Sequence, residues 1–204
     1  MVPLRRMFEE TILDDFPRTI LEVDTSGGGN GDFKSAGWFE AVISKQRIAY
    51  EKIIEHWGGI IILSDIDIQF FGSIKPALEV LMTEEMDMLF QSEHRCPREV
   101  NAGFIVMRCN DRVKTAYELL LKEDLRALDM GEQSWFNHYL HRSPLRWRLL
   151  PETFYAWSQN PGHPPEGILL HHANCTGGGN SVQKKLQQME TLRKIVKERH
   201  REGL

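Results

Sequence analysis

The feature that most restricts the fold is a uniformly apolar stretch, Ile-Ile-Ile-Leu at residues 60–63, placed directly after a long amphipathic segment. A strand with one face in water alternates apolar and polar residues, whereas an unbroken apolar run predicts a strand covered on both faces. Residues 35–57 carry apolar side chains at helical spacing, and the glycines at 58 and 59 predict the end of that helix. An α/β domain is therefore expected.

The same alternation continues along the chain. Helices are predicted at residues 2–13, 74–81, 110–121, 132–140 and from 182 onward. Further strands are predicted at residues 18–23, 86–91, 103–108, 146–150 and 168–172. Strands that alternate with helices predict a mostly parallel central sheet flanked by helices. With no internal repeat or linker, residues 1–204 are expected to form a single domain.

Composition narrows the class of partner. The 204 residues are 41% hydrophobic and 26% charged, as in an ordinary soluble globular protein. A formal net charge of −4 gives no cationic surface for nucleic acid, so no nucleic-acid partner is expected. No apolar run approaches the roughly 20 residues of a transmembrane helix. The three cysteines, Cys96, Cys109 and Cys175, have no metal-binding spacing, which favours free thiols and a cytoplasmic setting.

Two carboxylates follow the apolar strand in the sequence Asp65-Ile66-Asp67. Ligands of α/β sheets gather beyond the carboxyl ends of strands, which is where this D-x-D motif is expected. In an extended segment Asp65 and Asp67 point to one side while Ile66 returns to the core. Two close carboxylates repel each other, and a bound divalent cation such as Mg²⁺ or Mn²⁺ would offset this repulsion. Aspartates that merely solvate a strand end would give the same triplet.

Aspartate-nucleophile phosphatases also place D-x-D after an apolar strand. They require Thr or Val two positions after the second aspartate, where this chain has Gln69. Their later aspartate pair is missing as well, because Asp111, Asp124 and Asp129 are scattered. The sequence therefore disfavours a phosphatase.

Seven stretches, taken in order, resemble the nucleotide-diphospho-sugar transferase family, which consists of glycosyltransferases of the GT-A type. They are FKSAGWFEAVISKQRIAYEKI, LSDIDIQFFGS, LFQSE, VNAGFIVMRCN, GEQSWFNHYL, LLPETFYAWSQ and LHHANCTGGGNSVQKKL. The resemblance covers about residue 33 to the C-terminal helix. It implies a GT-A-like fold and transfer of a sugar from a nucleoside-diphosphate sugar to a hydroxyl of a carbohydrate or other acceptor. Such domains open with a strand that helps to hold the base. This chain opens with a predicted helix, so its first strand is expected to be missing, and either its N-terminus is truncated or the base is held in another way.

The resemblance also implies a set of metal ligands. Asp65 and Asp67 would carry Mn²⁺ (or Mg²⁺), completed by a histidine near the C-terminus. The sequence His171-His172-Ala-Asn offers two candidates. The family pattern His-Ala-Asn selects His172, and strand alternation sends His171 to the opposite side. A histidine in the core or at a sheet edge is the structural alternative.

The remaining candidate residues follow from the same resemblance. Glu132 and Gln133 resemble the Asp-Gln pair near the transferred sugar, with Glu in place of Asp, and are the predicted catalytic residues. Residues 101–103 resemble the Asn-x-Gly turn of the donor pocket, and the lysine pair after the 177–179 glycines would neutralise the diphosphate. Plain turns and an exposed helix start are the alternatives, and the glycines at 27–29 predict only a flexible loop. The predicted substrate-binding residues are Gln91, Glu93, Asn101, Gly103, Asn174, Lys184 and Lys185.

Two other functions remain open. A sugar-nucleotide-binding homologue would keep the metal site without turnover. A nucleotidyltransferase would use the same metal, but it would normally carry a Gly-rich basic loop after its first strand, and the sequence shows none.

Overall fold

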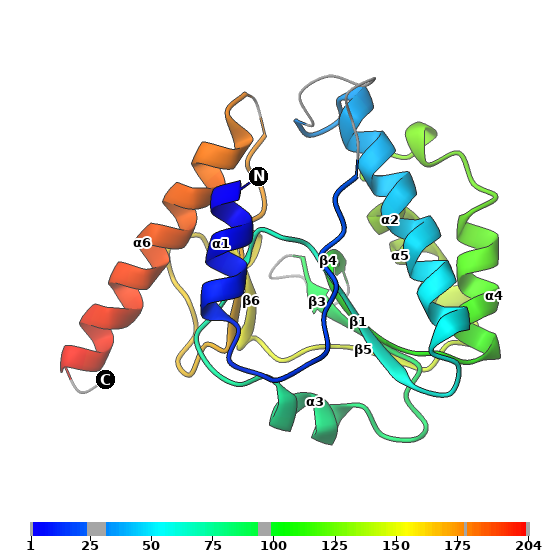
Figure 1. Ribbon diagram of the computed structural model, residues 1–204, viewed down its shortest axis with the longest axis horizontal. Helices are drawn as coiled ribbons and strands as arrows, with labels where there is room; N and C mark the ends of the chain where they lie inside the picture. The colour runs from blue at the N-terminus through cyan, green and yellow to red at the C-terminus, as the bar shows by residue number, and fades with distance from the viewer. Residues whose placement is uncertain (1, 24–31, 94–98, 178, 203–204) are drawn as a thin grey trace.

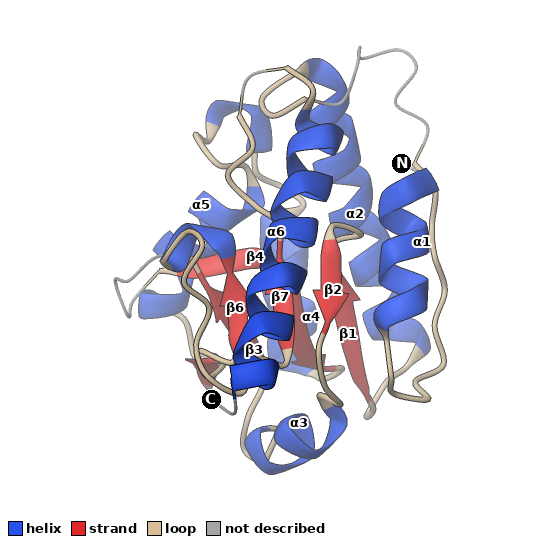
Figure 2. Ribbon diagram, turned by 90° about the vertical axis from the view of Figure 1, so that its left-hand side faces the viewer, coloured by secondary structure: helices blue, strands red, loops and turns tan. Residues whose placement is uncertain are grey.

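Two mixed sheets lie at the centre of the molecule, with helices on both sides (Figures 1 and 2). The computed structural model describes residues 2–23, 32–93, 99–177 and 179–202. The larger sheet has the order β1 (Ile60–Ser64), β4 (Val100–Arg108), β3 (Met88–Ser92), β5 (Trp147–Leu149). The smaller sheet has the order β2 (Ile68–Phe70), β7 (Leu170–His172), β6 (Phe154–Ala156). The predicted α/β class is confirmed.

The strand directions correct one prediction. The pairs β1/β4, β3/β4 and β2/β7 are antiparallel, and among the described strands β3/β5 and β6/β7 are the parallel pairs. The prediction of a mostly parallel sheet is therefore wrong. A parallel pair needs a crossover of a dozen or more residues, whereas the connection from β3 to β4 is too short for one.

The helices form where the spacing of apolar residues predicts them. They are α1 (Val2–Thr11), α2 (Ala36–Glu55), α3 (Lys75–Leu81), α4 (Asp111–Leu120), α5 (Glu132–Tyr139) and α6 (Ser181–Glu202). Short 3-10 turns occur at Leu125–Ala127, Leu140–Arg142 and Trp157–Gln159. Side-chain caps fix two helix starts, since Ser35 accepts a hydrogen bond from Trp38 and Asn110 accepts one from Val113, as predicted for Asn110. None of the helices in these described ranges is long and apolar enough to cross a bilayer.

Strands β3 and β4 form the middle of the core. On one face, α2, α4 and α5 pack against them, and the ring of Phe136 lies 5.2 Å from that of Phe90 and 6.0 Å from that of Tyr117. On the other face, Phe104 and Val106 of β4 pack with Phe8 of α1 and with α3. Successive residues of β4 thus serve two apolar clusters, which explains its continuous burial.

Strand β1 is covered less completely than predicted. Ile61 and Leu63 pack against one apolar cluster and Ile62 against the other, but these residues are only half-buried and Ile60 is 48% exposed. The strand predicted at residues 18–23 is absent, because these residues have no regular secondary structure. They line a cleft together with β1 and α2. The predicted first helix is confirmed as α1, while Cys96 and the glycine loop at 27–29 lie outside the described residues.

Candidate metal centre and its surroundings

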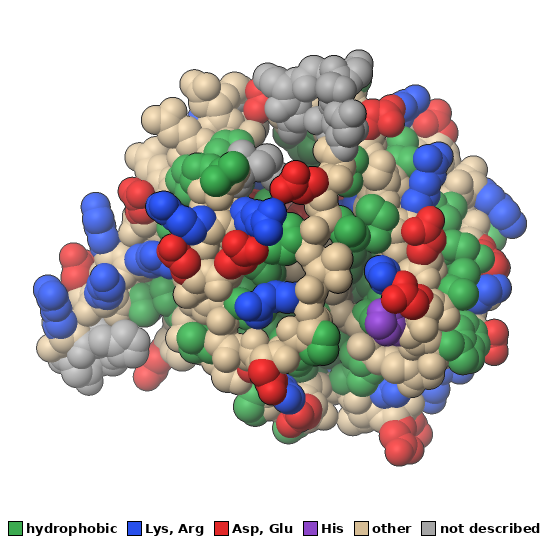
Figure 3. Space-filling model, viewed as in Figure 1, with side chains coloured by type: hydrophobic (Ala, Val, Ile, Leu, Met, Phe, Trp, Pro, Cys, Tyr) green, Lys and Arg blue, Asp and Glu red, His purple; other side chains and the backbone are tan. Residues whose placement is uncertain are grey.

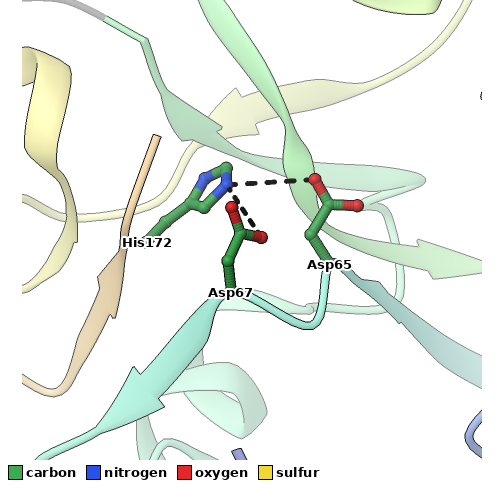
Figure 4. Close-up of side chains that lie close together, drawn as sticks. All are labelled: Asp65, Asp67 and His172. Atoms are coloured by element: carbon green, nitrogen blue, oxygen red, sulfur yellow. Dashed lines mark ion pairs between the residues drawn. The ribbon is translucent and has the colours of Figure 1, made fainter. Parts of the chain in front are cut away.

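Asp65, Asp67 and His172 converge on one point (Figure 4). One ligand atom from each lies within 4.8 Å of the others. Nε2 of His172 is 3.6 Å from Oδ1 of Asp67 and 3.9 Å from Oδ2 of Asp65. Two carboxylate oxygens and an imidazole nitrogen suit Mg²⁺, Mn²⁺ or Zn²⁺, so the donor set fits a divalent cation.

The backbone explains why three residues from distant segments meet. The chain crosses from the larger to the smaller sheet between β1 and β2, and the two aspartates lie on this crossing. The amide of Asp65 donates to the carbonyl of Gly103 at 2.7 Å, and the amide of Ala173 donates to the carbonyl of Asp67 at 2.9 Å. Pairing of β2 with β7 sets Ile68 opposite His172. Each aspartate is thereby fixed to a different sheet.

Gln91 determines which nitrogen of His172 faces the carboxylates. Its amide nitrogen donates to the carbonyl of Phe154 at 3.0 Å, which identifies the other atom as oxygen. That oxygen lies 3.0 Å from Nδ1 of His172, so Nδ1 carries a hydrogen and Nε2 is the nitrogen that faces the aspartates. Gln91 is fully buried behind the imidazole, whereas the sequence predicted that it binds substrate.

His171 points to the other side of β7, as predicted. Its Nδ1 lies 3.0 Å from the amide nitrogen of Gln69, and its ring stacks 5.7 Å from that of Tyr155. Burial lowers the pKa of His171 to about 3, so the ring stays neutral. His172 is therefore the histidine that the structure presents to the aspartates.

Two lysines contact the aspartates. Nζ of Lys45 lies 2.7 Å from Oδ1 of Asp65, 2.8 Å from the carbonyl of Ala102 and 3.5 Å from Glu132. Nζ of Lys185 lies 2.5 Å from Oδ2 of Asp67. Lys45 was not predicted. The sequence feature that could have identified it is its position between Val42 and Ala49 on the buried face of α2, where a charged side chain needs an oppositely charged partner.

Of the two lysines predicted to contact diphosphate, Lys185 reaches the aspartates. Lys184 donates instead to the carbonyl of Gly177 at 2.9 Å.

Burial and neighbouring charges lower the pKa of Asp67 but raise the pKa values of Glu132 and Lys45. Burial alone would raise the pKa of Asp67, but Lys185 and His172 outweigh it and hold that pKa well below its usual range. Burial raises the pKa of Glu132, and the negative charge of Asp65 adds to this effect although Lys45 opposes it. Burial would lower the pKa of Lys45, but Asp65 and Glu132 raise it, so the ammonium stays charged.

Residues 101–103 were predicted to form a turn, but they belong to strand β4 and pack directly against His172. Oδ1 of Asn101 accepts from the amide of Gly103 at 2.8 Å, and the amide of Ala102 donates to Gln133 at 3.2 Å. A β-carbon on Gly103 would lie 2.1 Å from Cε1 of His172, which no real contact allows. Glycine is thus required here by the imidazole itself.

Glu93 forms the centre of a polar wall. Asn101 donates to its carboxylate, and the amide of Asn174 lies 3.4 Å from both of its oxygens. Asn174 is in turn held by Ser158, whose backbone amide donates to it at 2.9 Å. Three of the predicted substrate-binding residues therefore belong to one network.

These groups open into one cleft of about 2320 Å³, which continues along β1 and the segment at residues 17–23. In the space-filling view, acidic and basic side chains meet in the hollow between the two halves of the molecule (Figure 3). The polar residues that line the cleft around the two aspartates include Lys45, Asp65, Asp67, Glu93, Asn101, Glu132, Gln133, His172, Asn174 and Lys185.

Fold and site together define an α/β protein with a candidate site for a divalent cation in a cleft. A family model described as nucleotide-diphospho-sugar transferase matches residues 19–189. The chain belongs to this family of transferases, which confirms the predicted family and enzyme class. No curated protein sequence matches the chain.

Solved structures that are similar to this one include the following two. A glycosyltransferase involved in the glycosylation of the major capsid of PBCV-1 has a TM-score of 0.50 and 14% identity, over 74% of this chain and 76% of that one. Mouse xyloside xylosyltransferase 1 in its apo form has a TM-score of 0.46 and 14% identity, over 70% of this chain. The chain spans 64% of the mouse enzyme. The first likeness supports the predicted GT-A-like fold.

Proposed function

We propose that the protein is a metal-dependent glycosyltransferase, which moves a sugar from a nucleoside-diphosphate sugar to an acceptor hydroxyl. The observation that carries the proposal is the convergence of Asp65, Asp67 and His172 in a cleft of a nucleotide-diphospho-sugar transferase chain. These three residues would hold Mn²⁺ or Mg²⁺, which would act as a Lewis acid on the departing diphosphate.

A positively charged side chain beside the candidate metal site would stabilise the departing diphosphate. Lys185 lines the cleft beside Asp67, so its ammonium is placed to attract phosphate oxygens. A fixed cation in a site shielded from water stabilises developing negative charge more strongly than it would in bulk solvent. We therefore assign Lys185, and not Lys184, to the diphosphate.

The carboxylates and amides around the centre would orient the sugars. Glu93 is buried with amide partners, which leaves its remaining lone pairs for sugar hydroxyls. Glu132 lies on the other side of Lys45 from Asp65 and lines the same cleft. We assign Glu93, Asn101 and Asn174 to hydroxyl binding, Glu132 to the transferred sugar, and Gln133 to positioning of residues 101–103.

A cytoplasmic location and a carbohydrate or other hydroxyl acceptor belong to the proposal as well. The free thiols of Cys109 and Cys175 support a reducing compartment. The cleft supports the acceptor, because it extends well beyond the metal centre along β1.

The test is incubation with a panel of UDP-, GDP- and dTDP-sugars and Mn²⁺, with and without acceptor oligosaccharides. Release of nucleoside diphosphate with a new glycosidic bond supports transfer. Release of pyrophosphate indicates a nucleotidyltransferase, and binding without release indicates a binding protein. Asp65→Asn and Asp67→Asn should each abolish turnover, while Asp111→Asn, at the start of α4, should not. Turnover in both site variants without metal contradicts the proposal.

A further inference from the structure

The two lysines and the candidate metal position share the same two carboxylates. Lys45 contacts Oδ1 of Asp65 at 2.7 Å, and Lys185 contacts Oδ2 of Asp67 at 2.5 Å. The second oxygen of each carboxylate faces Nε2 of His172, at 3.9 and 3.6 Å. Each aspartate therefore offers one oxygen to an ammonium and the other to the point where a cation would bind.

Neither lysine has an easy alternative position. The side chain of Lys45 is 17% exposed, and its ammonium is held by Asp65, by Glu132 and by the carbonyl of Ala102, which come from three different segments. The side chain of Lys185 is 27% exposed, and α6 holds it beside a buried carboxylate. Both ammonium groups must remain near a cation that binds the aspartates.

The charge of the cluster then depends on what is bound. Asp65, Asp67 and Glu132 supply three negative charges, and Lys45 and Lys185 supply two positive ones. The formal sum is −1, so a bound dication would turn the cluster to +1. A diphosphate, with at least two negative charges, would make the sum negative again. Like charges within a few ångströms repel strongly in a partly buried site.

We propose that Lys45 and Lys185 make metal binding conditional on the diphosphate: they weaken binding of the divalent cation alone and favour it together with a nucleoside diphosphate. The inference rests on the proposed function and adds to it that binding of the cation depends on binding of the nucleoside diphosphate. The cation and the diphosphate strengthen each other's binding through the two ammonium groups, and this coupling is reciprocal.

A purely orienting role for the lysines predicts the opposite sign. If the ammonium groups only hold the carboxylates in place, their removal frees the carboxylates and weakens cation binding. If they repel the cation, their removal strengthens it. Affinity for Mn²⁺ without any donor therefore separates the two roles.

The first experiment uses the unaltered protein. Electron paramagnetic resonance titration gives the affinity for Mn²⁺ alone and in the presence of UDP, GDP or dTDP, after correction for complexes formed in solution. We expect Mn²⁺ to bind about tenfold or more tightly with the nucleoside diphosphate that the protein accepts. Binding of both ligands with a coupling factor near one contradicts this inference alone. No binding of either ligand contradicts the proposed function as well.

The second experiment removes each charge while keeping the length of the side chain. Lys45→Met and Lys185→Met should each bind Mn²⁺ alone about fivefold more tightly and lose most of the coupling to the nucleoside diphosphate. Lys114→Met, which breaks the ion pair with Glu118 on α4, is the matched control and should change neither. Equal or weaker binding of Mn²⁺ by both site variants overturns the proposal.

Discussion

The imidazole of His172 donates from Nδ1 to the side-chain oxygen of Gln91, at a distance of 3.0 Å. Because the amide nitrogen of Gln91 is occupied by the carbonyl of Phe154, the direction of this hydrogen bond is fixed. The nitrogen that faces Asp65 and Asp67 is therefore Nε2. Gln91, which the sequence predicts to bind substrate, lies behind the candidate metal ligand and fixes its orientation.

Gln91→Leu should weaken binding of Mn²⁺ by about 10- to 100-fold, because His172 loses the partner that fixes its tautomer and orientation. Gln91→Glu keeps an acceptor at the same place and should retain more of the affinity. Gln69→Leu is the matched control, since Gln69 is equally buried but its side chain contacts His171 and not His172. Mn²⁺ titration by electron paramagnetic resonance measures all three, and equal losses in the Gln69 and Gln91 leucine variants would show a general effect of destabilisation.

Gly103→Ala should displace His172 and abolish sugar transfer. The added β-carbon would lie 2.1 Å from Cε1 and 2.7 Å from Nδ1 of the imidazole, so the ring must move away from the aspartates. Overpacking of this kind also costs about 1–3 kcal/mol of stability. Mn²⁺ affinity and turnover, measured well below the melting temperature, check the prediction.

Gly167→Ala separates the loss of the site from a loss of stability. Gly167 has a φ of 63°, so alanine strains the backbone there, but its β-carbon would meet nothing within 4 Å. This variant should lose a comparable amount of stability and keep the affinity for Mn²⁺. A Gly103→Ala protein with unchanged Mn²⁺ affinity would contradict the assignment of His172.

The helices and most strands could be predicted because their spacing of apolar residues is local. Residues 35–57 keep helical periodicity to the glycines at 58 and 59, and α2 forms there. The three candidate ligands were also predictable, since Asp65 and Asp67 are separated by a single residue and the histidine belongs to a recognisable pattern. A feature could be predicted where the residues that determine it lie within one short stretch of the sequence.

Other features depend on pairing between distant segments, which single residues do not encode. The run at residues 60–63 predicted a strand fully covered on both faces, but Ile61, Ile62 and Leu63 are only half-buried, because cover depends on how distant segments pack over β1. Gln91 and Phe154 meet only because β3 and β6 lie together. The contact between Lys45 and Asp65 joins α2 to the end of β1, so the lysine could be identified as buried but not as a partner of the metal ligand.

Asp87→Asn should destabilise the protein at neutral pH. Asp87 is fully buried, and Arg112 contacts both of its oxygens, at 2.6 and 2.7 Å. Burial opposes ionisation, but the hydrogen bonds from Arg112 and the amide of Arg146 hold the pKa of Asp87 below its usual value. Its contribution to stability is therefore present above the ordinary aspartate pKa of about 3.9 and is lost as the pH falls through the lower folded-state value.

Urea unfolding at pH 7 should show a loss of about 3 kcal/mol for Asp87→Asn, because Arg112 is left without its partner. The difference from the unaltered protein should narrow below about pH 4. Asp15→Asn, which removes an exposed partner of Lys75, should leave the free energy of unfolding almost unchanged at either pH. A loss for Asp87→Asn that is the same at pH 7 and pH 3.5 would contradict the role of its charge.

Glu132→Gln should have the opposite effect on stability in the metal-free protein. Burial, with the negative charge of Asp65, raises the pKa of Glu132, although Lys45 lowers it. A raised folded-state pKa means that the contribution of Glu132 is fully present below the ordinary glutamate pKa of about 4.3. It is lost as the pH rises through the folded-state value. Glutamine avoids this loss, so Glu132→Gln should be more stable than the unaltered protein at pH 7, by about 1 kcal/mol, and no more stable at pH 4.

The same Glu132→Gln variant should transfer sugar at least about 100-fold more slowly, because the side chain assigned to the transferred sugar loses its negative charge. Urea unfolding at pH 4 and pH 7 and turnover at pH 7 measure both effects, with Glu152→Gln at an exposed position as the control. A less stable Glu132→Gln protein at pH 7 would show that the ion pair with Lys45 outweighs the cost of burial. A more stable variant with little activity would mean that the carboxylate of Glu132 lowers the stability of the fold but is needed for the reaction.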